Sequence, residues 1–272
     1  MSTAPSILFV GDVVGSLGRR TLLALLPELR ERYEPTFVVV NGENVAGGLG
    51  ITPKLADELL GAGIDVITLG NHAYRRPEIG PYLDAGKPVI RPANYLPAQP
   101  GRGWVVVERD GVRLAVVNLS GNVFMQAGRV AFLEIDAALN ELEGKADHVL
   151  VDFHAEATSE KVAMGWHLDG RVTAVVGTHT HVPTADARVL PGGTAYITDV
   201  GMTGPRGGVI GVKKEQAIAA MRTHMHQRFE TSEEDPWLMG VFIRCAEEPR
   251  RAAGIEQVLV PWRPGQQAAA RS

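Results

Sequence analysis

The segment Gly177-Thr178-His179-Thr180-His181 places two imidazole groups two positions apart, directly after the apolar run from Val172 to Val176. In a strand, residues two apart share one face, so at the end of a strand both rings can turn toward one point. Two imidazoles that converge in this way suit a metal ion. A single His-x-His is also typical of a surface pair or of a hydrogen-bonded pair in a core, so further ligands are needed to decide.

Polar groups of the same chemical kind follow other apolar runs. In an open α/β sheet, sites form in the crevice beyond the carboxyl ends of the strands, so residues at these positions meet in one place. Asp12 or Asn71 alone, each next to a glycine, is also typical of a turn or a helix cap. Several such positions on one side of one predicted sheet favour a metal centre instead. The runs end in Gly11-Asp12, Asn41-Gly42-Glu43-Asn44, Gly70-Asn71-His72 and Asp152-Phe153-His154.

The elements that must position these residues alternate between strand and helix in the first part of the chain. Thr52 followed by Pro53 is typical of a helix N-cap and a first-turn proline. The alternation predicts a parallel sheet covered by helices. We expect strands at 7–10, 36–41 and 65–69, and helices near 18–32, 53–62 and 76–84.

The pattern changes after residue 102. The runs 103–109 and 112–119 are strand-like, and Asp110-Gly111 between them is a strong signal for a two-residue hairpin. We expect the later strands to form a second, more antiparallel sheet that packs on the first. Without an internal repeat or a low-complexity linker, residues 1–264 are predicted to form one domain and residues 265–272 a frayed tail. The later elements are helices near 130–143, 156–164 and 213–223, and strands near 148–153, 172–177, 194–198, 238–245 and 256–261.

Composition excludes several classes of protein. The formal net charge of −4 leaves no basic surface for nonspecific binding of nucleic acid. The polar start of the chain, and the lack of any run of ~18 apolar residues, predict neither a targeting peptide nor a membrane span, so we expect a cytoplasmic protein. Cys245 is the only cysteine, which excludes an intrachain disulfide and a thiolate metal cluster; its apolar run predicts a buried thiol.

The charges of the candidate ligands indicate what the site binds. Two divalent cations would bring four positive charges, and Asp12 with Glu43 supply two negative ones. Imidazole and amide ligands add no charge, so the pocket stays electropositive and favours a phosphate. Two metal ions ~3.5–4 Å apart can hold the entering and leaving oxygens of an in-line displacement at phosphorus. These residues therefore indicate phosphoester hydrolysis.

Two motifs resemble those of the calcineurin-like metallophosphoesterases: Gly70-Asn71-His72 matches the Gly-Asn-His block, and the segment from Gly177 to His181 the Gly-x-His-x-His block. Five longer blocks are similar to those of the bacterial YmdB-type cyclic-nucleotide phosphodiesterases. The resemblance is close up to about residue 210 and looser beyond it. It implies an α/β four-layer sandwich, with two mixed β-sheets packed together and flanked by helices. The blocks are GDVVGSLGR from 11, NGEN from 41, DFHAEATSEK from 152, GTHTHVPTAD from 177 and ITDVGMTGP from 197.

The chain departs from the wider superfamily at the first ligand blocks. Val14 stands where a histidine is usual, and Glu43-Asn44 replaces the usual bridging aspartate block, so that Asn44 can supply the missing ligand. Ala73 to Arg76, after the Gly-Asn-His block, also differ from the relatives, which affects the rim of the pocket. The resemblance implies one metal ion held by Asp12, Asn44 and His181, a second held by Asn71, His154 and His179, and Glu43 bridging both.

The resemblance also implies roles beyond the ligands. His72 is similar to the family's proton donor, which would protonate the departing alkoxide; the alternative is that it only orients Asn71. Iron or manganese is implied, and nitrogen and oxygen ligands also accept zinc. Other polar residues near the blocks are left out of the predicted site, or are expected at the surface or in packing: Arg19, Arg91, Asn94 and Thr203, and His148, His167, His224 and His226.

The predicted function is that of a dinuclear, metal-dependent phosphodiesterase. It would hydrolyse small cyclic nucleotides, 2′,3′-cyclic and also 3′,5′-cyclic, by attack of a metal-bridging hydroxide. Two alternatives stay open: a phosphomonoesterase or nucleotidase with the same site, and a non-catalytic, metal-containing regulator that senses nucleotide. The expected partner is a small phosphodiester, with no membrane and no strong nucleic-acid surface, and a homo-oligomer is compatible with the sequence.

Overall fold

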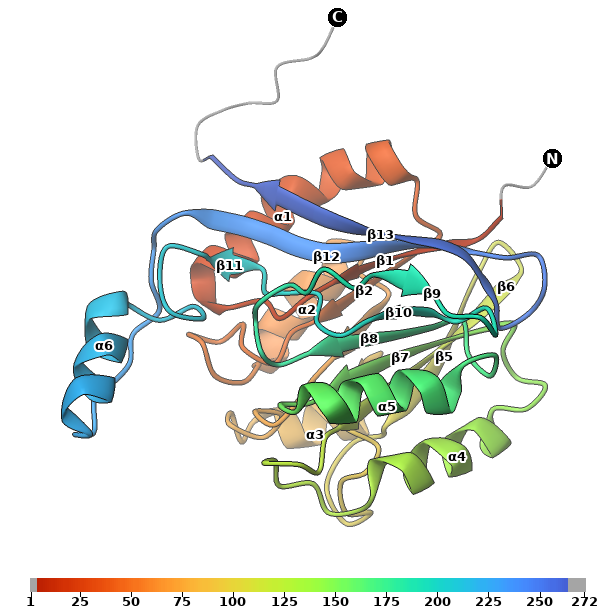
Figure 1. Cartoon of the computed structure of the whole chain (residues 1–272), viewed down its shortest axis with the longest axis horizontal. Coiled ribbons are helices and arrows are strands. Elements are labelled where there is room, and N and C mark those ends of the chain that lie inside the picture. Colours follow the sequence, from red (N-terminus) through yellow and green to blue (C-terminus); the bar gives the residue numbers. More distant parts are fainter. Residues whose placement is uncertain (1–3, 264–272) are drawn as a thin grey trace, which may run out of the picture.

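The central strands of the chain are apolar at almost every position because both of their faces are covered. In β1 (Ser6–Val10), Ile7 and Phe9 pack between the two sheets, whereas Leu8 and Val10 pack against helices. The computed structural model describes residues 4–263, and its ribbon shows two sheets with helices packed beside them (Figure 1). The predicted tail, 265–272, lies outside the described residues.

The first sheet combines a parallel core with antiparallel additions. Strands β1 to β4 run parallel, β12 pairs antiparallel with β1, and β11 and β13 pair antiparallel with β12. Its order is β11-β12-β1-β2-β3-β4, with β13 beside β12. The further strands are β2 (Phe37–Asn41), β3 (Val66–Thr68), β4 (Val89–Ile90), β11 (Gly204–Pro205), β12 (Pro236–Cys245) and β13 (Ala252–Pro261).

The second sheet has the order β5-β6-β7-β8-β10-β9. Its four inner strands run parallel, and only the edge strands β5 and β9 are antiparallel. The β5–β6 hairpin turns at Asp110 and Gly111, whose positive φ values of 52° and 78° confirm the predicted turn. The strands are β5 (Trp104–Arg109), β6 (Val112–Ser120), β7 (His148–His154), β8 (Ala174–Thr178), β9 (Arg188–Val189) and β10 (Ala195–Ile197).

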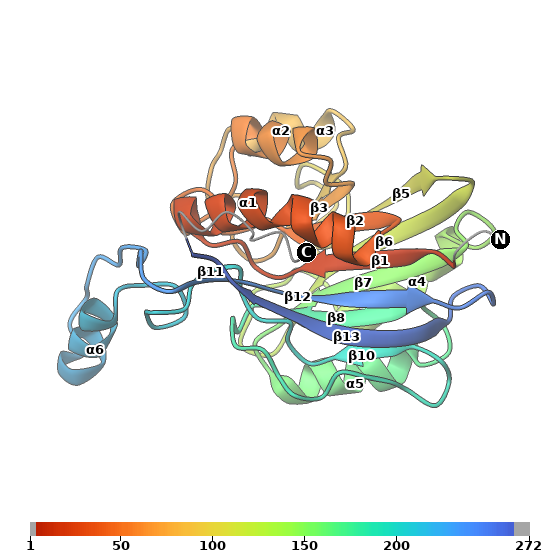
Figure 2. The ribbon, with the colours of Figure 1, turned by 90° about the horizontal axis from the view of Figure 1, so that it is seen from above.

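The sandwich of two mixed sheets flanked by helices is confirmed (Figure 2). Helices α1, α2 and α3 share a core with the outer face of the first sheet, and α4 and α5 share one with the second sheet. A third core, which contains the buried thiol of Cys245, lies between the sheets. The helices are α1 (Gly15–Tyr33), α2 (Pro53–Gly61), α3 (Ile79–Asp84), α4 (Ala131–Glu141), α5 (Thr158–Leu168) and α6 (Lys214–Thr223).

The expected membership of the second sheet was wrong for the last strands. β12 and β13 extend the first sheet, and the second sheet is mainly parallel. An apolar pattern shows that a strand is buried, but it does not show which strand lies beside it. These strands were expected in the second sheet because they come late in the sequence.

Residues 206–235, between β11 and β12, form an arm that carries α6 away from the sheets (Figures 1 and 2). At its base, Val212 and Thr231 form an isolated antiparallel bridge. None of the helices in residues 4–263 is long and apolar enough to cross a membrane.

Candidate metal centre

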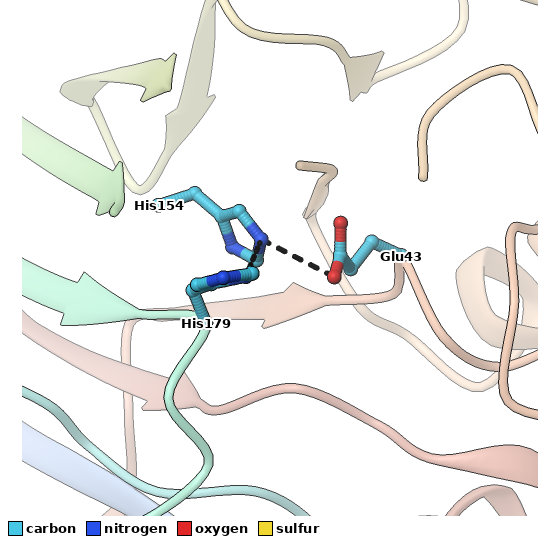
Figure 3. Close-up of side chains that lie close together, drawn as sticks. All are labelled: Glu43, His154 and His179. Carbon is cyan, nitrogen blue, oxygen red and sulfur yellow. Dashed lines mark hydrogen bonds and ion pairs between the residues drawn. The ribbon is translucent and has the colours of Figure 1, made fainter. Parts of the chain in front are cut away.

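The loops after β1, β2, β3, β7 and β8 meet between the two sheets. His154 at the end of β7 lies against Glu43, which follows β2, and against His179, which follows β8 (Figure 3). The structure thus brings together side chains from both sheets that the sequence places at strand ends. One network of contacts includes Asp12, Glu43, Asn44, Asn71, His72, His154, His179 and His181.

The two histidines of the His-x-His segment do not reach the site by strand alternation, as the sequence had suggested. β8 ends at Thr178, and His179 and His181 lie in the loop beyond it, with φ values of 95° and 66°. A positive φ is strained for a residue with a side chain and persists only where the surroundings hold it. The turn, rather than the pleat of a strand, aims these rings.

Thr180, between the two histidines, anchors this turn. Its backbone N–H and its hydroxyl donate to Asp199 Oδ2 at 3.2 Å and 2.6 Å, and Lys161 Nζ donates to the same oxygen at 2.8 Å. Lys161 and Asp199 are both buried. Sequence reasoning missed this pair, although both residues stand inside the blocks that begin at residues 152 and 197; a lysine and an aspartate within such blocks were the available signal.

The hydrogen bonds of His154 identify the ring nitrogen that can bind a metal ion. Its Nδ1 lies 2.9 Å from Thr178 Oγ1, whose own proton goes to the Asp152 carboxylate at 2.7 Å, so Nδ1 is the donor. In the neutral ring, Nε2 then carries a lone pair. This lone pair faces other electron-rich atoms, which repel it unless a proton or a cation lies among them. They are Asn71 Oδ1 at 2.9 Å, His179 Nδ1 at 3.1 Å and Glu43 Oε1 at 3.2 Å.

In each of the other two histidines, one ring nitrogen also donates a hydrogen bond to the protein and the other faces the site. His181 Nδ1 lies 2.8 Å from the carbonyl oxygen of Ile210, and His179 Nε2 lies 3.0 Å from the Glu156 carboxylate. These nitrogens donate, which leaves His181 Nε2 and His179 Nδ1 with lone pairs directed at the site. Burial lowers the pKa of His179 to about 3 and keeps its ring neutral. Metal-binding histidines are commonly oriented through the far nitrogen in this manner.

Asp12 contributes a buried oxygen that lacks a donor. Its Oδ2 accepts the backbone N–H of His179 at 3.1 Å, whereas Oδ1 has no hydrogen-bond partner within residues 4–263. Oδ1 lies 3.9 Å from His181 Nε2. Burial raises the pKa of Asp12 because a charged oxygen without a donor is costly in the interior. A cation beside Oδ1 would remove this cost.

The central carboxylate, Glu43, is fully buried. Burial opposes its charge, but His154 and His72 outweigh burial and hold the pKa of Glu43 well below its ordinary value. Burial likewise opposes protonation of His154, yet Glu43 and Asp12 raise the pKa of His154 to about 9. Both shifts show that the carboxylates draw positive charge to this point, which a proton or a bound cation can supply.

The spacing of the donor atoms fits a metal ion. Adjacent ligands of a six-coordinate ion with bonds of about 2.1 Å lie about 3.0 Å apart, close to the contacts around His154 Nε2. Gly70 keeps this space open, because a Cβ at this position would lie 2.3 Å from Glu43 Oε2 and 2.3 Å from His154 Nε2. Glu43, His154 and His179 offer ligand atoms within 4.8 Å of one another. These three residues therefore form a cluster whose spacing suits a metal ion.

Asn44 connects His72 to this cluster. Its Oδ1 accepts from His72 Nδ1 at 2.7 Å, and its Nδ2 donates to Glu43 Oε1 at 3.0 Å. The amide nitrogen also lies 3.3 Å from His181 Nε2. The Asn44 oxygen has a second lone pair, so it could coordinate an ion as the predicted ligand while it accepts the hydrogen bond from His72.

The polar residues that were left out of the predicted site have structural partners. Arg19 pairs with Glu58 at 3.2 Å. The buried side chain of Arg91 donates to the carbonyl of Pro92 at 2.8 Å. The remaining two are also buried: Asn94 Nδ2 donates to the Ser120 carbonyl, and Thr203 Oγ1 to that of Met239.

The chain is similar in sequence and in structure to several known proteins. A family model described as "YmdB-like protein" matches residues 8–258. The chain is 46% identical over 254 residues to the 2′,3′-cyclic-nucleotide 2′-phosphodiesterase of Bacillus subtilis strain 168, covering 93% of this chain and 96% of that protein. A crystal structure of a hypothetical protein from Thermus thermophilus superposes with a TM-score of 0.88 at 41% identity, covering 95% of this chain and 100% of that chain. A crystal structure described as a novel phosphatase from Mycoplasma pneumoniae has a TM-score of 0.89 at 34% identity, with 96% and 95% covered.

Proposed function

The chain belongs to the YmdB-like family, and on that premise we propose that it is a metal-dependent phosphoric diester hydrolase that opens 2′,3′-cyclic nucleotides. The observation that carries this proposal is the common orientation of His154, His179 and His181. Each holds one ring nitrogen in a hydrogen bond to the protein and turns the other into the space shared with Asp12 and Glu43. A cation in this space would be held by all three nitrogens together, with each ring already oriented by its other nitrogen.

Two metal ions are proposed, following the division of the ligands into two groups that the family resemblance implies, with Glu43 bridging the two ions. Asp12 Oδ1 and His181 Nε2 face each other in one group, and Asn71, His154 and His179 form the other. Asn44 would join the first group. When bound, two such ions neutralise charge on the phosphoryl oxygens and lower the pKa of a coordinated water. Iron or manganese is the proposed native metal, with zinc as the alternative.

The small number of carboxylates at the site accounts for the binding of an anionic phosphodiester. The two carboxylates, Asp12 and Glu43, leave part of the charge of two divalent ions uncompensated, so an anionic diester is attracted and oriented there. Both carboxylates are buried, so water screens the charges around them little.

His72 is proposed as the proton donor to the leaving oxygen. Its Nδ1 is engaged by Asn44, and its partly exposed ring borders the pocket, so the other nitrogen can deliver a proton to a bound substrate. The hydrogen-bond partners of the His72 side chain do not include Asn71 within the described chain, which supports this role over that of orienting Asn71.

A substrate panel tests the proposal. Metal-replete protein should hydrolyse 2′,3′-cyclic AMP and bis(p-nitrophenyl) phosphate, and lose both activities after chelation. The panel includes 3′,5′-cyclic AMP, a cyclic diester with a six-membered ring, and p-nitrophenyl phosphate, a monoester. Elemental analysis of protein purified without added metal gives the number and identity of the ions.

The competing function is that of a phosphomonoesterase, since one similar solved protein is described as a phosphatase. Much slower hydrolysis of the diesters than of the monoester would favour it over our proposal. Nucleotide binding without any turnover by metal-replete protein would instead favour a non-catalytic sensor.

A further inference from the structure

The pocket over the metal centre has two chemically different walls. It has a volume of about 330 Å³, and the residues of the metal centre, among them His72 and His181, form one wall. Besides Val14 and Thr231, the pocket is lined by four apolar residues, Leu49, Ile210, Val212 and Phe229. We call these four residues the apolar wall. None of the four side chains carries a hydrogen-bonding group or a charge.

Large apolar side chains are left exposed on this wall. Leu49, Ile210 and Phe229 have exposed fractions of 48%, 53% and 53%. Single exposed apolar residues are common, but several that line one pocket beside a polar centre are typical of a ligand site. The wall is therefore suited to a ligand that is anionic at one end and apolar at the other.

The structure holds the wall in a fixed place relative to the metal centre. Ile210 has a φ of 44°, which is strained for a β-branched residue, and its carbonyl accepts the hydrogen bond from His181 Nδ1 at 2.8 Å. Phe229 lies at the base of the arm, next to the hydrogen bond from Lys213 N to Glu230 O at 3.0 Å and near the Val212–Thr231 bridge. The segments 210–213 and 229–231, which carry three of the four wall residues, are thus hydrogen-bonded to each other. The first segment is also hydrogen-bonded to His181, a candidate ligand.

We propose that the apolar wall is the nucleobase subsite, with the Phe229 ring as the surface on which the base stacks. The inference rests on the proposed function, because it requires the phosphate to lie at the metal centre. An apolar wall contacts the flat face of a base and forms no hydrogen bonds with its edge. We therefore expect different bases to bind. Purine nucleotides should bind more tightly than pyrimidine nucleotides, because a purine buries more apolar surface.

A binding comparison isolates the contribution of the base. Metal-replete protein is titrated with adenosine 3′-monophosphate and with ribose 3-phosphate, which carries a hydroxyl in place of the base. Wild type should bind the nucleotide at least about tenfold more tightly, as expected for one stacked base. Phe229→Ala should bring this ratio close to one without changing the affinity for ribose 3-phosphate, and Phe229→Tyr, which retains the ring, should restore it.

Matched variants distinguish the wall from the arm in general. Met221 in α6 is 70% exposed and does not line the pocket, so Met221→Ala should leave the ratio unchanged. Leu49→Ala, on a different loop, should lower the ratio and tests the wall independently should Phe229→Ala unfold, which its melting temperature reveals. A wild-type ratio near one, or an equal loss for both ligands in folded Phe229→Ala, would overturn the inference. Because the assay measures binding, an absence of turnover would count against the proposed function and not against the subsite.

Discussion

Lys161 Nζ lies 2.8 Å from Asp199 Oδ2 in a buried ion pair, and the same carboxylate oxygen accepts two hydrogen bonds from Thr180. Because Thr180 separates His179 from His181, this pair holds the strained turn that aims both imidazoles. A local hydrogen-bonding network of this kind is what a non-glycine residue with positive φ requires. The ion pair therefore positions the two proposed ligands, His179 and His181, through Thr180.

Replacing Lys161 with methionine should weaken metal binding and the fold together. The change leaves the Asp199 carboxylate buried without its partner, which typically costs ~3–5 kcal/mol in the free energy of unfolding. Loss of an outer hydrogen bond that orients metal ligands typically lowers metal affinity ~10–100-fold. Urea unfolding of chelated protein and metal titration measure the two effects. Lys213→Met breaks an exposed ion pair with Glu230 and should change neither. Full metal affinity in Lys161→Met would show that the pair does not position the turn.

The free energy of unfolding should fall at acid pH, and part of this fall should come from His148, at the start of β7. Burial lowers the pKa of this imidazole below its ordinary value of 6.5. As the pH falls below 6.5, the unfolded chain therefore takes up a proton that the folded chain still refuses, so the free energy of unfolding falls, by at most about 1.4 kcal/mol per pH unit.

Urea unfolding between pH 7.5 and 5.5 measures this effect. His148→Asn keeps a nitrogen near Thr173 Oγ1, the partner of His148 Nδ1 at 3.2 Å, and should lose less stability over this range than wild type. His226→Asn, at an exposed position, should follow wild type. Identical pH profiles for all three proteins would contradict the assignment.

The layers of the fold could be predicted because the sheet-forming segments carry their burial in the sequence. Runs such as 37–40 and 149–151 are apolar throughout, which only strands covered on both faces require. The pairing partners of β12 and β13 could not be predicted, because register and neighbour choice depend on contacts distant in the sequence.

The clustering of the strand-end residues followed from one topological rule, that parallel strands end at a common edge. The division into ligands of two ions came from the family resemblance. The topological rule brought Asp12, Asn71 and His154 into one place without any knowledge of the turns. It could not supply the positive φ of His179, nor the tie between Ile210 and His181, because both depend on loops that have no periodic pattern. The apolar wall was missed for the same reason.

Gly70→Ala should remove metal without unfolding the chain. The added Cβ would lie 2.3 Å from Glu43 Oε2 and from His154 Nε2, so one of these groups must leave its place. Metal analysis of the purified variant should show a marked loss, with a secondary structure like that of wild type by circular dichroism. In Gly61→Ala, at the end of α2, no atom lies within 4 Å of the new Cβ, and metal content should stay normal. Normal metal content in Gly70→Ala would exclude our placement of the ions.

His72→Asn should separate protonation of the leaving group from metal binding. The proposed donor acts on the departing oxygen, so its loss should lower kcat for 2′,3′-cyclic AMP by ~10²–10⁴-fold. The fall should be much smaller for bis(p-nitrophenyl) phosphate, because p-nitrophenolate leaves without a proton. Metal content should remain that of wild type, whereas Asp12→Ala, which removes a proposed ligand, should lose metal and both activities. An equal fall on the two substrates, or a loss of metal in His72→Asn, would assign His72 to the support of the metal centre, through its 2.7 Å contact with Asn44, and not to proton transfer.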